Sequence, residues 1–73
     1  MRVFVVGYKG TDTDDILGVY ADIEMAKRVM HNDYEETLLG FEPDFKEVES
    51  NHIYMRNRYN DECEWYIHET ELR

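Results

Sequence analysis

The side chains best suited to catalysis or metal binding are His31, His52, His68 and Cys63. No two histidines have the i, i+4 spacing by which a helix holds a metal ion, and Cys63 has no second thiol as partner. A nucleophilic cysteine needs a base and a third group that orients the base, and no spacing brings a histidine to Cys63. We therefore expect no catalytic residue, no metal site and no cofactor, and we interpret Cys63 as a small buried hydrophobe.

The acidic run from Asp12 to Asp15 invites comparison with a calcium-binding loop. Such a loop needs alternating acids, a glycine and a distant glutamate in one frame, and Ile16 and Leu17 interrupt that frame here. The run is therefore interpreted as a solvated loop tip. The four glycines form no phosphate-binding loop, and with 17 acids some carboxylate pair always falls close together, so neither feature indicates an enzyme.

Charge and size limit the classes of function. The 73 residues include 8 Lys+Arg and 17 Asp+Glu, for a net charge of −9, and form one expected domain, residues 1–73. Phosphates repel such a chain, so we expect no direct nucleic-acid binding and no docking on an anionic membrane. No apolar run approaches the ~20 residues that span a bilayer. A single cysteine favours a reducing compartment, so we expect a cytoplasmic protein.

The first third of the chain predicts a β-hairpin. Val3–Tyr8 is a run of β-branched and aromatic residues typical of a central strand. Ile16–Ala21 predicts a second strand, and the polar segment Lys9–Asp15 predicts a long acidic loop between the two.

A helix is expected next. Asp22 is a suitable N-cap and Gly40 a suitable stop. Between them, apolar residues recur at helical spacing and would form one buried stripe: Ile23, Ala26, Met30, Tyr34, Leu38 and Phe41. Weak helix formers lie near Asn32. Asp33 could be the N-cap of a second helix, in a capping box with Glu36. The segment Ile23–Leu39 is therefore either one helix or two short helices broken near Asn32.

The last third predicts a turn at Glu42–Asp44 and two more strands, one around Ile53–Tyr59 and one from Cys63 toward Leu72. The expected class is α+β with the order ββαββ. It comprises a four-stranded, mostly antiparallel sheet with helix on one face.

The segment 31–51 concentrates the negative charge. It holds seven acids against Lys46 alone, which is −6 of the total −9. The acids are Asp33, Glu35, Glu36, Glu42, Asp44, Glu47 and Glu49. They form either a solvated face that maintains solubility or an acidic surface that docks on a basic partner.

Aromatic residues are the second unusual feature, since the chain has six Tyr, three Phe and one Trp. One helix covers only one face of the sheet, so we expect Tyr20, Tyr54 and Tyr66 on the other face. They either serve cross-strand packing or form an apolar surface for a partner. We expect a homodimer, because a second copy would cover that face and enlarge a small core.

Three stretches carry a resemblance. Val3–Tyr8, the strand-to-helix junction Gly18–Ala26 and the acidic closing stretch Trp65–Leu72 resemble those of small uncharacterised proteins of phages and bacteria. The resemblance extends over the whole chain, but its motifs are structural and assign no functional residue. In size, charge and lack of catalytic motifs the chain is similar to acidic phage host-takeover proteins that mimic DNA and inhibit basic host proteins.

The leading hypothesis is a non-enzymatic inhibitor of a basic, DNA-binding host protein of the nucleoid or of transcription, whose seven acids replace phosphates. The alternative is an interaction module that binds a host defence or cell-division protein through its aromatic sheet face. A small enzyme or a nucleotide-sequestering protein would instead require a concave site.

Overall fold

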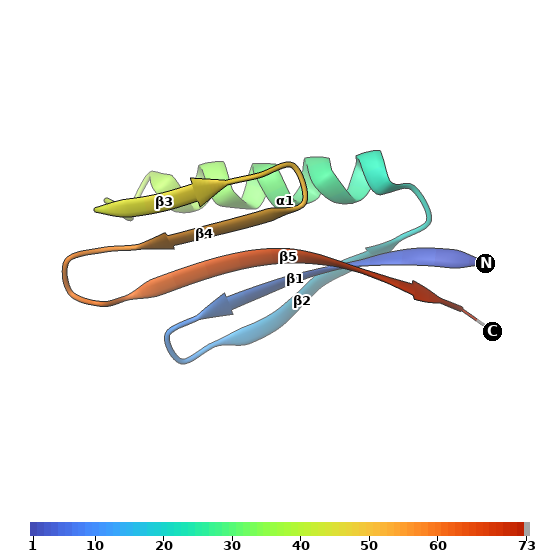
Figure 1. The fold of residues 1–73 in the computed structure, drawn as a ribbon, viewed down its shortest axis with the longest axis horizontal. Coiled ribbons are helices and arrows are strands. Elements are labelled where there is room, and N and C mark those ends of the chain that lie inside the picture. The colour runs from blue at the N-terminus through green and yellow to red at the C-terminus, as the bar shows by residue number, and fades with distance from the viewer. Residues whose placement is uncertain (73) are drawn as a thin grey trace.

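One helix packs on one face of a five-stranded antiparallel sheet in the computed structural model, which describes residues 1–72 (Figure 1). The elements are β1 (Arg2–Gly10), β2 (Asp14–Tyr20), α1 (Ile23–Leu38), β3 (Phe45–Val48), β4 (His52–Arg56) and β5 (Glu62–Glu71). Across the sheet the strands follow the order β2-β1-β5-β4-β3, so β5 is central and β1 is an interior strand. The α+β class with antiparallel strands is confirmed, but the order is ββαβββ and not ββαββ.

The strand absent from the prediction is β3. All four of its residues are exposed, because it lies at the edge of the sheet and pairs only with β4. Neither face of β3 is buried, so its sequence, Phe-Lys-Glu-Val, does not alternate between apolar and polar residues. That alternation is the signal by which a strand is recognised in a sequence. Backbone pairing with β4 holds it in place, from Phe45 opposite Arg56 to Val48 opposite Ile53.

The first hairpin is longer, and its tip shorter, than the sequence predicts. Lys9 pairs with Asp14, so most of the expected loop belongs to the two strands. The backbone N–H of Gly10 donates a 2.7 Å hydrogen bond to the carbonyl of Thr13 and closes the tip. The pairing of β1 with β2 shifts register between Val6 and Gly7, which places an irregularity in the edge strand.

Helix α1 is continuous from Ile23 to Leu38. Of the two possibilities that the sequence left open, one helix or two short helices broken near Asn32, the structure has the first. The Asp22 carboxylate caps it as predicted, accepting a 2.9 Å hydrogen bond from the backbone N–H of Glu24. Asp33 lies inside the helix and not at a second N-terminus, so a capping box there is wrong. Burial of Met30 and Tyr34 on either side of Asn32 outweighs the weak helix propensity of the middle turn.

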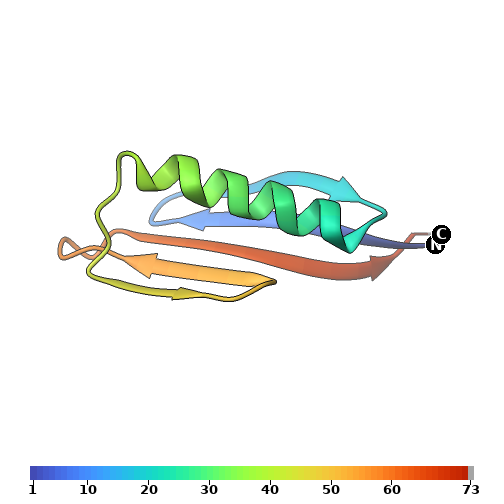
Figure 2. The same cartoon turned by 90° about the horizontal axis from the view of Figure 1, so that it is seen from above.

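The core lies between α1 and the sheet. Seen from above, α1 runs over β1, β2 and β5, with β4 and β3 beyond it (Figure 2). The expected helical stripe is confirmed from Ala26 onward, since Ala26, Met30 and Tyr34 are buried and Leu38 and Phe41 pack beside them, whereas Ile23 is only half-buried and lies outside this cluster. The sheet contributes the remaining buried members of this cluster, namely Val6, Ile53, Met55, Cys63 and Trp65. Interpreting Cys63 as a buried hydrophobe is therefore confirmed.

The two ends of the described chain lie side by side (Figure 1). The backbone N–H of Leu72 donates a 2.7 Å hydrogen bond to the carbonyl of Met1. Within residues 1–72, α1 falls short of the length and apolarity that crossing a membrane requires.

Candidate functional site

Asp33 does not belong to an exposed acidic surface, although it was expected there. Its Oδ2 accepts a 2.8 Å hydrogen bond from Nε1 of the buried Trp65, so the carboxylate faces the sheet. The half-buried Asp33 is therefore a partner of the core, which corrects its assignment to a binding surface.

The other six predicted carboxylates are exposed. We call them the acidic end: Glu35, Glu36, Glu42, Asp44, Glu47 and Glu49. Within residues 1–72, the three ion pairs of the structure involve other acids, namely Glu24, Glu64 and Glu69. The acidic end thus presents carboxylates that no lysine, arginine or histidine of the described chain neutralises.

The C-terminal end of α1 makes this charge costly. The last turn of the helix contains no basic residue, yet the negative end of the helix dipole lies there. Glu35 and Glu36 are close to that end, and Glu42 and Asp44 follow within the connection to β3. Carboxylates at a helix C-terminus destabilise the helix, whereas cations would stabilise it. The distribution of charge therefore works against stability.

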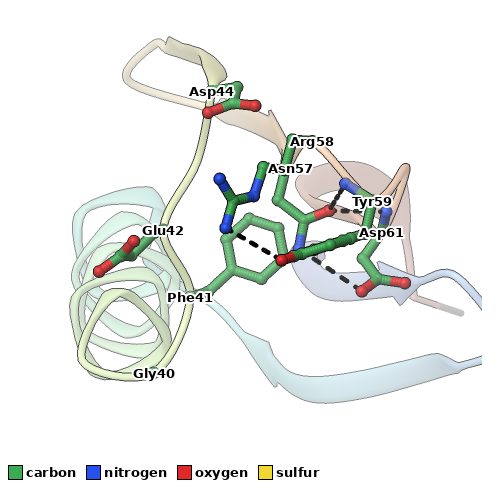
Figure 3. Close-up of a pocket in the computed structure, with 8 residues that line it drawn as sticks. All are labelled: Gly40, Phe41, Glu42, Asp44, Asn57, Arg58, Tyr59 and Asp61. Carbon is green, nitrogen blue, oxygen red and sulfur yellow. Dashed lines mark hydrogen bonds between the residues drawn. The ribbon is translucent and has the colours of Figure 1, made fainter.

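The acidic end wraps around the molecule and does not lie in one plane. Glu36 borders a shallow hollow together with Leu17 of β2, at one edge of the sheet. Glu47 belongs to β3, at the opposite edge, and pairs with Tyr54 of β4. Glu42 and Asp44 lie on the segment that leads from α1 to β3 (Figure 3).

Two hollows flank this segment. The first, of about 320 Å³, is the Phe41–Tyr59 hollow, and Figure 3 shows its lining: Gly40, Phe41, Glu42, Asp44, Asn57, Arg58, Tyr59 and Asp61. Arg58 Nη2 donates a 3.0 Å hydrogen bond to Tyr59 Oη, and the guanidinium carbon lies 5.0 Å from the centre of that ring. Arg58, which carries the only guanidinium in this lining, is thus fixed in place by the side chain of Tyr59.

The turn that carries Arg58 and Tyr59 is built around Asn57. The side-chain oxygen of Asn57 accepts hydrogen bonds from the backbone N–H groups of Tyr59, at 2.9 Å, and Asp61, at 3.0 Å. Asn60 takes the left-handed conformation, with φ 66°, which asparagine tolerates better than most residues. The turn expected at Asn60 and Asp61 begins earlier, at Asn57, and β4 therefore ends at Arg56 and not at Tyr59.

The second hollow, of about 550 Å³, lies where α1 approaches β3, and we call it the Leu38–Phe45 hollow. It is lined by Leu38, Phe41, Glu42, Pro43, Asp44, Phe45 and Lys46. The sequence analysis named the acids here and placed Leu38 and Phe41 in the buried stripe of the helix, but it predicted no hollow and did not single out Phe45. The available signal was the alternation of Phe41 and Phe45 with Glu42 and Asp44 around a proline.

Tyr54 and Tyr66 lie on the face of the sheet that α1 leaves uncovered. Tyr66 pairs with His52 and Gly7, and its ring covers Gly7 so closely that a Cβ there would meet Cζ of Tyr66 at 2.1 Å. Tyr54 Oη donates a 2.8 Å hydrogen bond to Glu62 Oε1. This acceptor raises the pKa of Tyr54, since it binds the protonated hydroxyl.

The assignment of Tyr20 to that face is wrong. Tyr20 is the cross-strand partner of Phe4, and both pack against the core beneath α1. Directly paired residues share a face of the sheet, so the position of Phe4 dictates that of Tyr20.

Cys63 and His52 contact different partners on opposite faces of the sheet. Cys63 Sγ lies 3.3 Å from Tyr8 Oη. Burial and this contact raise the pKa of the Tyr8 hydroxyl to about 12, so Tyr8 remains protonated at neutral pH. His52 Nε2 lies 2.6 Å from Glu64 Oε2 on the uncovered face. No group of three or more His, Cys, Asp or Glu side chains in residues 1–72 is arranged to hold a metal ion.

Comparison with protein-family models, with curated proteins and with solved structures yields no match to this chain.

Proposed function

We propose that the protein is a non-enzymatic, cytoplasmic binding protein whose acidic end occupies the nucleic-acid-binding surface of a basic protein. The observation that carries this proposal is the set of six exposed carboxylates that lack a counter-charge in residues 1–72. Two of them, Glu35 and Glu36, lie in the last turn of α1, where they cost stability. A basic partner would neutralise them and remove that cost.

The partner follows from the chemistry of the acidic end. Carboxylates spread over a curved surface attract the lysines and arginines that otherwise contact phosphates. Attraction between opposite charges accelerates association and is screened by salt. The wrapped arrangement suits a concave basic cleft better than a flat basic face, because Glu36 and Glu47 lie toward opposite edges of the sheet.

The test is a pull-down from nuclease-treated bacterial lysate with the immobilised protein, washed at rising salt and then challenged with duplex DNA. We expect basic, DNA-binding proteins to elute with salt and to be displaced by DNA. The variant Glu35→Lys/Glu36→Lys/Glu42→Lys should lose them. The control Asp12→Lys/Asp14→Lys/Asp15→Lys, which has the same net charge but alters the first hairpin, should keep them. Equal binding by both variants would contradict the proposal.

A second candidate function, self-association, rests on the uncovered face. Val5 pairs with Val19, and Gly7 pairs with Ile16 on one side and Tyr66 on the other, so these side chains share a face. Val19 is 56% exposed and Ile16 is 59% exposed. None of these five residues is charged, so they form an apolar area within a face that carries Glu64 and Glu47 farther along the sheet.

Sedimentation velocity tests this second candidate. Wild-type protein should sediment as a dimer, Val19→Asp should sediment as a monomer, and the control Val48→Asp on β3 should behave as wild type. A monomeric wild-type protein at high concentration would exclude the candidate.

A further inference from the structure

The Leu38–Phe45 hollow differs from the rest of the acidic end because its walls are largely apolar. Leu38 and Phe41 also pack against the core, and Pro43 continues the lining toward β3. Phe45 borders the hollow at the start of β3, where its ring also packs against that of Tyr54, with centroids 6.1 Å apart. Its volume of about 550 Å³ lies within the ~300–1,000 Å³ range of ligand sites. An apolar side chain placed there would leave water and contact other apolar side chains.

Charge at the rim decides which partner the hollow fits. Glu42 and Asp44 border it, are exposed, and also line the neighbouring Phe41–Tyr59 hollow. Lys46 is the one base of the lining. The two carboxylates would repel an acidic segment and would attract lysine or arginine side chains on either side of the buried residue.

We infer that the Leu38–Phe45 hollow is an anchor site for a basic peptide segment with one large apolar side chain. The apolar side chain enters the hollow, and flanking lysines or arginines meet Glu42 and Asp44. This inference rests on the proposed function and adds to it the chemistry of the recognised segment. The acidic end attracts any basic segment, whatever its sequence. The hollow distinguishes between such segments, because the free energy gained by burying an apolar side chain depends on the shape of that side chain.

Two synthetic peptides test the inference by fluorescence anisotropy with the full chain. Both are fluorescein-labelled and rich in lysine and serine. One has a central phenylalanine and the other has serine at that place. We expect the phenylalanine peptide to bind at least about tenfold more tightly, the ratio that corresponds to burying one large apolar side chain. This ratio should persist in high salt, whereas both affinities fall.

Two matched variants locate the effect. Phe45→Thr should remove the preference for phenylalanine, while Val48→Thr, a control on the same strand with similar exposure (46% against 43%), should keep it. Both residues lie on an edge strand, but the ring of Phe45 also packs against that of Tyr54, with centroids 6.1 Å apart, so circular dichroism should establish that Phe45→Thr is folded. Leu38→Asn gives a second test at the helix side of the hollow, with circular dichroism to establish that the variant is folded.

The outcomes separate the inference from the proposed function. Equal affinity for the two peptides, each weakened by Glu42→Lys/Asp44→Lys, would overturn the anchor site and leave the acidic surface standing. A preference that survives both Phe45→Thr and Leu38→Asn would likewise overturn it. Absence of binding by either peptide at low salt would overturn both proposals.

Discussion

The indole nitrogen of Trp65 donates a 2.8 Å hydrogen bond to the carboxylate of Asp33 and thereby joins the central strand to the middle of α1. Trp65 is fully buried, and the rings of Tyr8 and Tyr34 lie against it, with centroids 5.2 and 5.6 Å away. A buried indole N–H needs an acceptor, and Asp33 is the acceptor that the helix provides.

Replacing Asp33 by alanine should therefore lower the free energy of unfolding. The indole N–H would lose its partner inside the protein, at a cost of about 1–3 kcal/mol. Asp33→Asn keeps an acceptor oxygen and should cost less. Urea denaturation measures both. Asp33→Asn should also retain any basic partner, and loss of the partner in this variant would show that Asp33 belongs to the binding surface after all.

Gly7 and Tyr66 should show energetic coupling. A methyl group at position 7 would collide with the Tyr66 ring, so Gly7→Ala should be destabilising by about 1–3 kcal/mol as the ring moves aside. In a Tyr66→Ser background the obstacle is gone, and the same change should cost much less. A double-mutant cycle by thermal unfolding measures the difference, and additive effects would mean that the ring does not cover Gly7 in solution.

Tyr8 should make the protein sensitive to alkali. Its pKa is raised from 10.0 to about 12 in the folded chain, chiefly by burial and then by the contact with Cys63. A raised folded-state pKa stabilises the protein fully below pH 10, and this contribution is lost as the pH rises toward 12. Urea unfolding at pH 8 and at pH 11 should show a smaller decline for Tyr8→Phe than for wild type. Tyr59→Phe, which removes an exposed phenol, is the control, and identical declines in wild type and Tyr8→Phe would contradict the assignment.

Reversing one charge near the end of α1 should stabilise the protein and impair its binding. Glu36→Lys puts a cation near the negative end of the helix dipole, where about 0.3–1 kcal/mol of stabilisation is typical. The same change removes one carboxylate from the acidic end. A higher melting temperature together with weaker retention of the basic partner is the expected pair of results. A lower melting temperature would mean that Glu36 has a structural partner.

Residues with strong local signals were predictable from the sequence. The helical stripe, the cap at Asp22 and the inward alternation of Cys63, Trp65 and Ile67 follow from spacing alone. The missed strand, β3, has no such signal, because only its backbone pairing with β4 defines it.

The candidate site depended more on tertiary contacts. Exposure of six acids followed from their number and spacing, whereas the role of Asp33 depends on Trp65, 32 residues away. The face on which Tyr20 lies follows from its pairing with Phe4, and the sequence does not state the register. The two hollows arise only when the connection after α1 folds back toward β3 and the turn at Asn57.

The position of β5 at the centre of the sheet has a kinetic consequence. Its neighbour β1 is the first element of the chain, whereas β5 is the last. The two strands pair along the whole length of β1, and Arg2 lies opposite Glu71. The first hairpin and α1 therefore cannot bury Trp65 or complete the sheet until the sixth element arrives. Contacts this distant in sequence form slowly, since a long loop must close before they form. We expect folding to be governed by the docking of β5, with the hairpin β1–β2 and the pair β3–β4 brought together in that single event.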